Sequence, residues 1–354
     1  MLQRRAIMSS PDQSLSAVGS LLSDSYGFRS PFQWVRSRPT VADLFKPGQR
    51  CGIYVFRFAN DQYYVGQAVD VTRRFVQHTK NHNDIQEMAF CCVPNERLNE
   101  VEQKLIAHLE SKRLSLRNIS LTSFPKGKSD LDLIVPADAQ EDWLNRNITH
   151  RLQAHFIDHP DLQAKYAARF HKLEARARFS QDICAFLRRY FERCVLDPAQ
   201  TELSFWSLTA LPSESLYADD IAMCRLNMFW CEVLTIWGNS YNGAIYYSIR
   251  LAKSKVTKAH LRRLKLVSLR IDPRYYPRGG ADQLSIQVKG IDDALAVLDD
   301  ENVVVAAKTF NLRQMQKGAT VYGRYHCLDF AQHILAPHHN RVNARCALTV
   351  GSAK

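Results

Sequence analysis

Six side chains between residues 50 and 120 carry groups that can act together on a phosphate ester. They are the phenols of Tyr54 and Tyr64, the guanidinium of Arg74, the imidazole of His78, the carboxylate of Glu102 and the amide of Asn118. Hydrolysis of a phosphodiester needs an activated water, a cation that takes up developing charge, and donors directed at the phosphate oxygens. A carboxylate is a hard oxygen ligand for Mg²⁺ or Mn²⁺, and a planar guanidinium fits two phosphate oxygens at once.

A predicted β-hairpin and helix carry the first four of these groups. Residues 51–58 and 62–68 are rich in aromatic and β-branched residues and flank a turn at residues 59–61. Asp70 can then cap a helix over residues 71–78. Because Arg74 and His78 are four residues apart, that helix places them on one face. An apolar run at residues 88–93 predicts a third strand.

A later helix is expected to position the carboxylate. Either Asn95 or Asn99 can cap it, and its apolar stripe consists of Leu98, Val101, Leu105, Ile106 and Leu109. Glu102 therefore lies near the edge of the buried stripe.

The order and spacing of these residues resemble the GIY-YIG nuclease superfamily. Gly52-Ile53-Tyr54 is followed, ten residues on from Tyr54, by Tyr64-Val65-Gly66, and Arg74 stands eight residues after Gly66. His78, the sequence Glu102-Gln103-Lys104-Leu105-Ile106 and Asn118 complete the pattern. Either tripeptide alone is a weak signal, but six elements in order are a strong one. The resemblance covers about residues 50–120, a fifth of the chain.

The resemblance implies a role for each matched residue. Gly52 and Gly66 are motif glycines, and Tyr54 acts as the general base or orients the attacking water. Tyr64 holds the phosphate or supports Tyr54, while Arg74 clamps the non-bridging oxygens. His78 relays a proton or contacts phosphate, Glu102 binds Mg²⁺ or Mn²⁺, and Asn118 braces the site.

Neighbouring residues offer alternatives to three of these assignments. Arg73 competes with Arg74, although only Arg74 satisfies the family spacing. Glu100 competes with Glu102, and the Leu-Ile context favours Glu102. His82 is a possible metal partner of His78 or a further phosphate contact.

The expected fold class is α+β, organised in five segments. Residues 1–48 form an N-terminal arm with at most one short helix, and residues 49–124 a GIY-YIG-like domain with a three-stranded antiparallel sheet flanked by helices. A linker and helical region covers residues 125–200, a mixed α/β domain residues 201–336, and a flexible tail residues 337–354. Within the later part, residues 244–249, 264–271 and 303–306 predict strands, and residues 180–194, 292–298 and 327–335 predict helices.

Positive charge is concentrated in one stretch of the later part. The chain carries a net charge of +12, and residues 250–278 contain ten basic residues against one acidic residue. Such a concentration favours a polyanionic partner, here DNA or RNA, although a solvated helix surface is an alternative. The candidate nucleic-acid-binding residues are Arg250, Lys253, Lys255, Lys258, Arg262, Arg263 and Arg274.

Composition restricts the cellular setting. The sequence has no run of about 20 apolar residues that would span a membrane, and its start does not resemble a secretory signal. Its nine cysteines include no Cys-x-x-Cys pair, so we expect a reducing, cytoplasmic setting.

The resemblance implies a metal-dependent DNA endonuclease whose later segments provide targeting or form a homodimer. Two other functions stay open: a catalytically silent nucleic-acid-binding protein, and a nuclease toxin delivered to competitors.

Overall fold

The computed structural model contains two compact units, Met1–Lys126 and Gly127–Lys354. It describes residues 11–28, 32–119, 121–123, 129–146, 149, 151–153, 157–212, 220–272 and 275–336, with the exception of the side chains of residues 11–17 and 177–180. The expected tail at residues 337–354 and the candidate Arg274 lie outside these ranges. Both units combine helices with an antiparallel sheet, so the fold class is α+β.

The first unit is built on a four-stranded sheet of order β1-β4-β2-β3. The strands are β1 (Gln33–Trp34), β2 (Gly52–Phe58), β3 (Tyr63–Ala68) and β4 (Ile85–Cys92). The predicted hairpin is confirmed, and its register places Tyr54 opposite Gly66 and Phe56 opposite Tyr64. The sheet has four strands instead of the expected three, because β1 is too short to show an alternating pattern.

The helices of the first unit are α1 (Pro11–Tyr26), α2 (Val71–Asn81) and α3 (Leu98–Ser111), with 3₁₀ turns at Ala42–Leu44 and Asn95–Arg97. Asp70 caps α2 as predicted, since its side chain accepts from the backbone N–H groups of Thr72 and Arg73. Neither Asn95 nor Asn99 caps α3. The 3₁₀ turn runs directly into that helix and puts Arg97 at the cap position without a side-chain bond.

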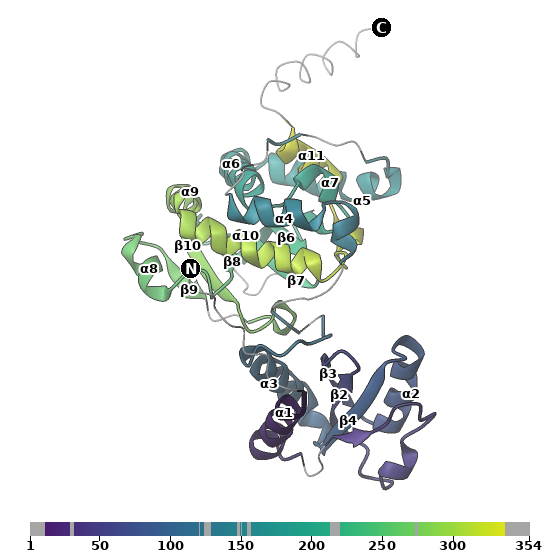
Figure 1. The fold of residues 1–354 in the computed structure, drawn as a ribbon. Helices are drawn as coiled ribbons and strands as arrows, with labels where there is room; N and C mark the ends of the chain where they lie inside the picture. Colours follow the sequence, from purple (N-terminus) through teal and green to yellow (C-terminus); the bar gives the residue numbers. More distant parts are fainter. Residues whose placement is uncertain are drawn as a thin grey trace. The chain divides into compact units, whose positions relative to one another are not determined.

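The two faces of this sheet carry different cores. Ile53 and Val55 point toward the face that packs with α1 and α3, and Tyr54 and Phe56 point toward the face that packs with α2. Figure 1 shows α2 on one side of the strands and α1 and α3 on the other. Helix α1 falls in the range expected to be an arm, yet its Val18 belongs to the buried core.

The second unit contains a six-stranded antiparallel sheet of order β5-β6-β7-β8-β10-β9. The strands are β5 (Trp206–Ala210), β6 (Asp220–Met228), β7 (Cys231–Asn239), β8 (Ile245–Leu251), β9 (Arg270–Asp272) and β10 (Leu284–Lys289). The strand predicted at residues 244–249 is β8. The strand predicted at residues 264–271 is wrong over most of its length, because β9 begins at Arg270.

The helices of the second unit are α4 (Ala137–Asn145), α5 (Pro160–Glu174), α6 (Ala177–Cys194), α7 (Pro198–Thr201), α8 (Lys258–Arg263), α9 (Ile291–Asp299), α10 (Glu301–Gln316) and α11 (Leu328–Leu335). The helices predicted at residues 180–194, 292–298 and 327–335 are confirmed as α6, α9 and α11. The strand predicted at residues 303–306 is wrong. Asp300 caps α10 there, and this helix is buried on several sides, so its valines form a continuous apolar run.

Helices and strands of this unit share one large core. In Figure 1, α4 and α10 cross in front of β6, β7 and β8. Among the described residues of the whole chain, no helix is both long and apolar enough to cross a membrane.

Candidate active site

Tyr54 occupies the centre of the candidate site. It lies on β2, between β4 and β3, and its side chain is fully buried on the face toward α2. The ring covers Gly66 on the neighbouring strand so closely that a Cβ atom on Gly66 would stand 2.3 Å from the Tyr54 hydroxyl oxygen. Gly66 is therefore required for the position of the Tyr54 ring, since real Cβ atoms do not approach an oxygen so closely.

His78 on α2 forms the shortest contact with Tyr54. The distance from the Tyr54 hydroxyl oxygen to His78 Nε2 is 2.8 Å. Burial, followed by the charges of Arg74 and His82, lowers the pKa of His78 to about 4. Because the imidazole is then neutral at pH 7, the bond joins two neutral groups, and the tautomer of His78 decides which of them donates.

Arg74 lies one helical turn before His78 and contacts the same hydroxyl. Its Nε atom donates to the Tyr54 oxygen at 3.4 Å, and its Nη1 atom donates to Gln77 at 3.0 Å. Burial first, and then Tyr64, raise the pKa of Tyr54 above its ordinary value, while Arg74 opposes the shift. Arg74 is exposed, so its guanidinium contacts both the buried Tyr54 hydroxyl and the solvent.

Tyr64 completes the aromatic part of the site. Its ring centre lies 4.8 Å from that of His78 and 6.2 Å from that of Tyr54. Burial raises the pKa of Tyr64, and Arg74 opposes that shift. Both phenols are therefore protonated at neutral pH.

Glu102 reaches the site from α3, on the opposite face of the sheet. Burial raises the pKa of Glu102 from 4.5 to about 7, against the opposing effects of Arg74 and of hydrogen bonding with Gln67. The charge of Glu102 in turn affects Tyr54 and Tyr64. Because β3 is the edge strand next to α3, a side chain on α3 can approach residues of the other face around that edge.

Gln67 was not predicted from the sequence. Its side-chain amide donates to Asn99 of α3 at 2.6 Å and also hydrogen-bonds with Glu102. It thereby ties β3 to the helix that bears the carboxylate. The available signal was its position directly after the Tyr64-Val65-Gly66 tripeptide.

Asn118 supports the site without contacting the phenols. Its side-chain oxygen accepts from the Val65 N–H at 2.9 Å, and its Nδ2 atom donates to the Val65 carbonyl at 2.7 Å. The residues just before it pair with Tyr63 through backbone bonds. The Asn118 side chain thus bonds to the backbone of β3 as a neighbouring strand would, and it supports the edge strand that carries Tyr64 and Gly66.

The structure separates the alternative residues from the predicted ones. Arg73 is highly exposed and lies near Asp70, whereas Arg74 contacts Tyr54. Glu100 is exposed and paired with Lys104, whereas Glu102 is half-buried at the edge of β3. The His82 ring stacks on His78 with their centres 6.0 Å apart. Across the described ranges, no group of three or more His, Cys, Asp or Glu side chains is placed to hold a metal ion.

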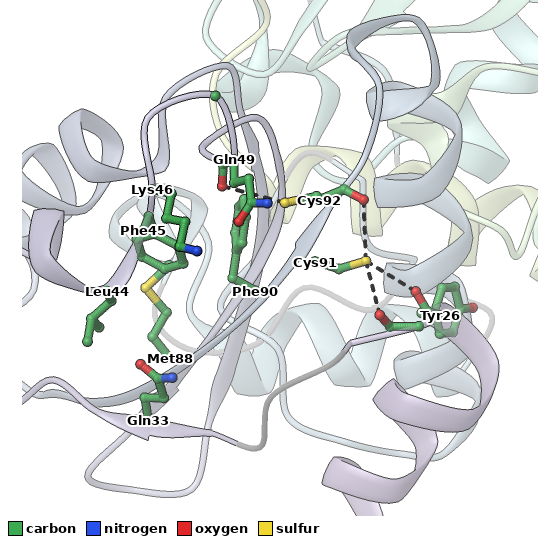
Figure 2. Close-up of a pocket in the computed structure, with 12 residues that line it drawn as sticks. Tyr26, Gln33, Leu44, Phe45, Lys46, Gln49, Met88, Phe90, Cys91 and Cys92 are labelled. Atoms are coloured by element: carbon green, nitrogen blue, oxygen red, sulfur yellow. Dashed lines mark hydrogen bonds between the residues drawn. The ribbon is translucent and has the colours of Figure 1, made fainter.

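A separate cavity of about 630 Å³ lies in the first unit and is lined by none of the predicted site residues. In Figure 2, Phe45 and Met88 lie toward the left, Cys91 and Cys92 toward the right, and Phe90 stands between them. The Cys91 thiol donates to the carbonyl of Tyr26 at 3.3 Å.

The basic stretch of the second unit divides into exposed and buried residues. Lys253, Lys255, Lys258, Arg262 and Arg263 are exposed on α8 and on the loop before it. Arg250 differs from the prediction, since it is 5% exposed and lies within β8. Its guanidinium donates to Glu232 and Gln283 and stacks over the Tyr276 ring. Arg250 is thus committed to internal contacts, because β8 turns it toward these neighbours.

Comparison with protein-family models, with curated proteins and with solved structures finds no match for this chain.

Proposed function

We propose that the first unit is a metal-dependent endonuclease of the GIY-YIG type that hydrolyses phosphodiester bonds of DNA. The observation that carries the proposal is the arrangement around the Tyr54 hydroxyl. This group shares a hydrogen bond with a neutral His78 and accepts one from Arg74, with Tyr64 stacked beside it and Glu102 within electrostatic range. Four different elements supply these groups, so chance adjacency in the chain does not explain their meeting.

Glu102 is the residue proposed to hold Mg²⁺ or Mn²⁺. A carboxylate whose pKa burial raises to about 7 gains from a cation, because the cation favours the ionised form. Mg²⁺ retains several waters and needs only one or two protein carboxylates when substrate phosphates supply further oxygens. The single carboxylate of Glu102 therefore fits such an ion. When bound, the ion would stabilise the negative charge that develops on the phosphate.

Tyr54, His78 and Arg74 can together orient and activate the attacking water. Tyr54 is a protonated phenol at neutral pH and can orient the attacking water by hydrogen bonding. Arg74 favours the phenolate form of Tyr54, which could accept a proton from that water. His78, whose pKa burial lowers to about 4, stays neutral and positions the Tyr54 hydroxyl through their hydrogen bond. Arg74 is exposed on its outer side, so its remaining donors can orient the phosphate oxygens.

The second unit is proposed to contact the substrate backbone. The five exposed cations on α8 and its preceding loop provide phosphate contacts without sequence preference. RNA is the alternative substrate, and a cytoplasmic setting goes with either nucleic acid.

The test compares four proteins on supercoiled plasmid, linear duplex, single-stranded DNA and RNA, each with Mg²⁺, Mn²⁺ or chelator. The proteins are wild type, Glu102→Ala, Tyr54→Phe and the control Glu100→Ala, which removes an exposed carboxylate of the same helix. We expect cation-dependent cleavage by wild type and control, and a loss of about 10²-fold or more in Tyr54→Phe. Cleavage that survives Glu102→Ala would refute the assignment of the active site. Tight binding of nucleic acid without cleavage under any cation would refute the proposed endonuclease activity.

A further inference from the structure

A second cavity lies in the second unit, at the β5 edge of its sheet, and has a volume of about 270 Å³. Thr209, Arg225 and Asn227 line its floor. These residues alternate along their strands with the core residues Leu208 and Leu226, so they point away from the shared hydrophobic core. The cavity is smaller than the roughly 300–1,000 Å³ of pockets for drug-sized ligands, so it suits one small ring system.

Asn227 is the most informative residue of this cavity. Asn227 is 3% exposed, and its carboxamide makes no side-chain hydrogen bond within the described part of the chain but keeps contact with the open cavity. Ser207, which lies opposite Asn227 on β5, also has a buried hydroxyl without a partner. A carboxamide that meets an open cavity without a protein partner can bond with a polar ligand or with water there.

The charged residues of the cavity are held in place. Arg225 Nη1 lies 3.2 Å from Glu232 Oε1, and the other oxygen of Glu232 accepts from the Tyr276 hydroxyl at 2.7 Å. Arg169 reaches the cavity from α5, where its Nη1 atom donates to the Leu211 carbonyl at 3.3 Å. Glu232 also lines the cavity and pairs with Arg225, so the lining has one net positive charge, which favours an anionic group on the ligand.

Aromatic rings form the remaining walls. Tyr322, Tyr325 and Tyr166 all line the cavity, and Tyr325 is 40% exposed at its mouth. Tyrosine rings stack on planar heterocycles and tolerate different ones, because every such ring has a π-face. A carboxamide presents a donor and an acceptor side by side, which matches the hydrogen-bonding edge of a nucleobase.

We propose that this cavity binds a nucleobase that is hydrogen-bonded to Asn227, stacked on a tyrosine, and followed by a phosphate near Arg225 and Arg169. The base comes either from a free nucleotide or from a single-stranded polynucleotide. The inference rests on the second unit alone and is independent of cleavage by the first.

Isothermal titration of the full-length protein in chelator tests this inference. The probes are the four nucleoside monophosphates in ribo and deoxy form, and short single-stranded DNA and RNA oligonucleotides. The variants are Asn227→Leu and Tyr325→Ala, with Tyr241→Ala as the control, because Tyr241 is 89% exposed on the same unit and does not line the cavity.

We expect saturable binding of at least one probe by wild type and by the control. Binding should weaken at least about tenfold in Asn227→Leu, since two hydrogen bonds are lost, and several-fold in Tyr325→Ala. Binding of monophosphates assigns a free nucleotide, and binding of oligonucleotides alone assigns a polynucleotide.

A second readout separates binding from structure. Because the Asn227 amide has no partner to lose, Asn227→Leu should leave the unfolding temperature unchanged or raise it. The proposal is overturned if no probe binds, if Asn227→Leu binds as wild type does, or if that variant unfolds several degrees earlier. In the first two cases the amide holds water only, and in the third it has a structural role.

Discussion

Replacing Glu102 with glutamine should stabilise the first unit at neutral and higher pH while abolishing cleavage. The pKa of Glu102 rises from 4.5 to about 7 on folding, chiefly through burial. The folded state therefore binds the proton more tightly than the unfolded state. Ionisation of Glu102 lowers the free energy of unfolding, and this penalty grows as pH rises from about 4.5 to 7. Since each pKa unit corresponds to about 1.4 kcal/mol, the penalty is about 3 kcal/mol at pH 8 and below about 1 kcal/mol at pH 5.

Hydrogen exchange of β2 and β3 amides in the full-length protein, followed in chelator, measures this effect. The free energy of opening in Glu102→Gln should exceed that of wild type by about 3 kcal/mol at pH 8, and the difference should nearly vanish at pH 4. Glu100→Gln is the matched control, and it should bring no gain because Lys104 lowers the pKa of Glu100. Equal opening free energies for Glu102→Gln and wild type at pH 8 would show that the carboxylate is hydrated and the reasoning wrong.

Three further substitutions and one pH profile test other parts of the first unit. Gly66→Ala places a Cβ atom 2.3 Å from the Tyr54 hydroxyl oxygen. It should therefore destabilise the first unit by about 1–3 kcal/mol in thermal unfolding, and it should abolish plasmid nicking. Gly19→Ala, with nothing within 4 Å of the added atom in helix α1, should instead stabilise by about 0.5–1 kcal/mol. Asn118→Ala removes both bonds to Val65 and should lower the unfolding free energy by about 2–3 kcal/mol. Cleavage at low Mg²⁺ should rise with pH through about 7, and its midpoint should move to lower pH as Mg²⁺ is increased, because cation and proton compete for one carboxylate.

Local elements of the first unit followed from local patterns. The aromatic and β-branched residues of 51–58, the turn after them and the Asp70 cap depend on neighbours within a few positions, so the sequence predicted β2, β3 and α2. Such reasoning failed for residues 303–306, because a helix that is buried on several sides shows the same continuous apolar run as a strand. It also missed β1, whose two residues pair only once β4 is present.

The sequence by itself determined which reactive groups the chain carries and which short elements hold them. Only the tertiary structure decided that Tyr54 meets His78, that Asn118 bonds to a strand 53 residues earlier, and that Arg250 turns inward. It also decided the raised pKa of Glu102 and the unpartnered amide of Asn227. The physical reason is that burial and contact depend on strand register and on packing between distant segments, whereas residue type and spacing describe only what is near along the chain.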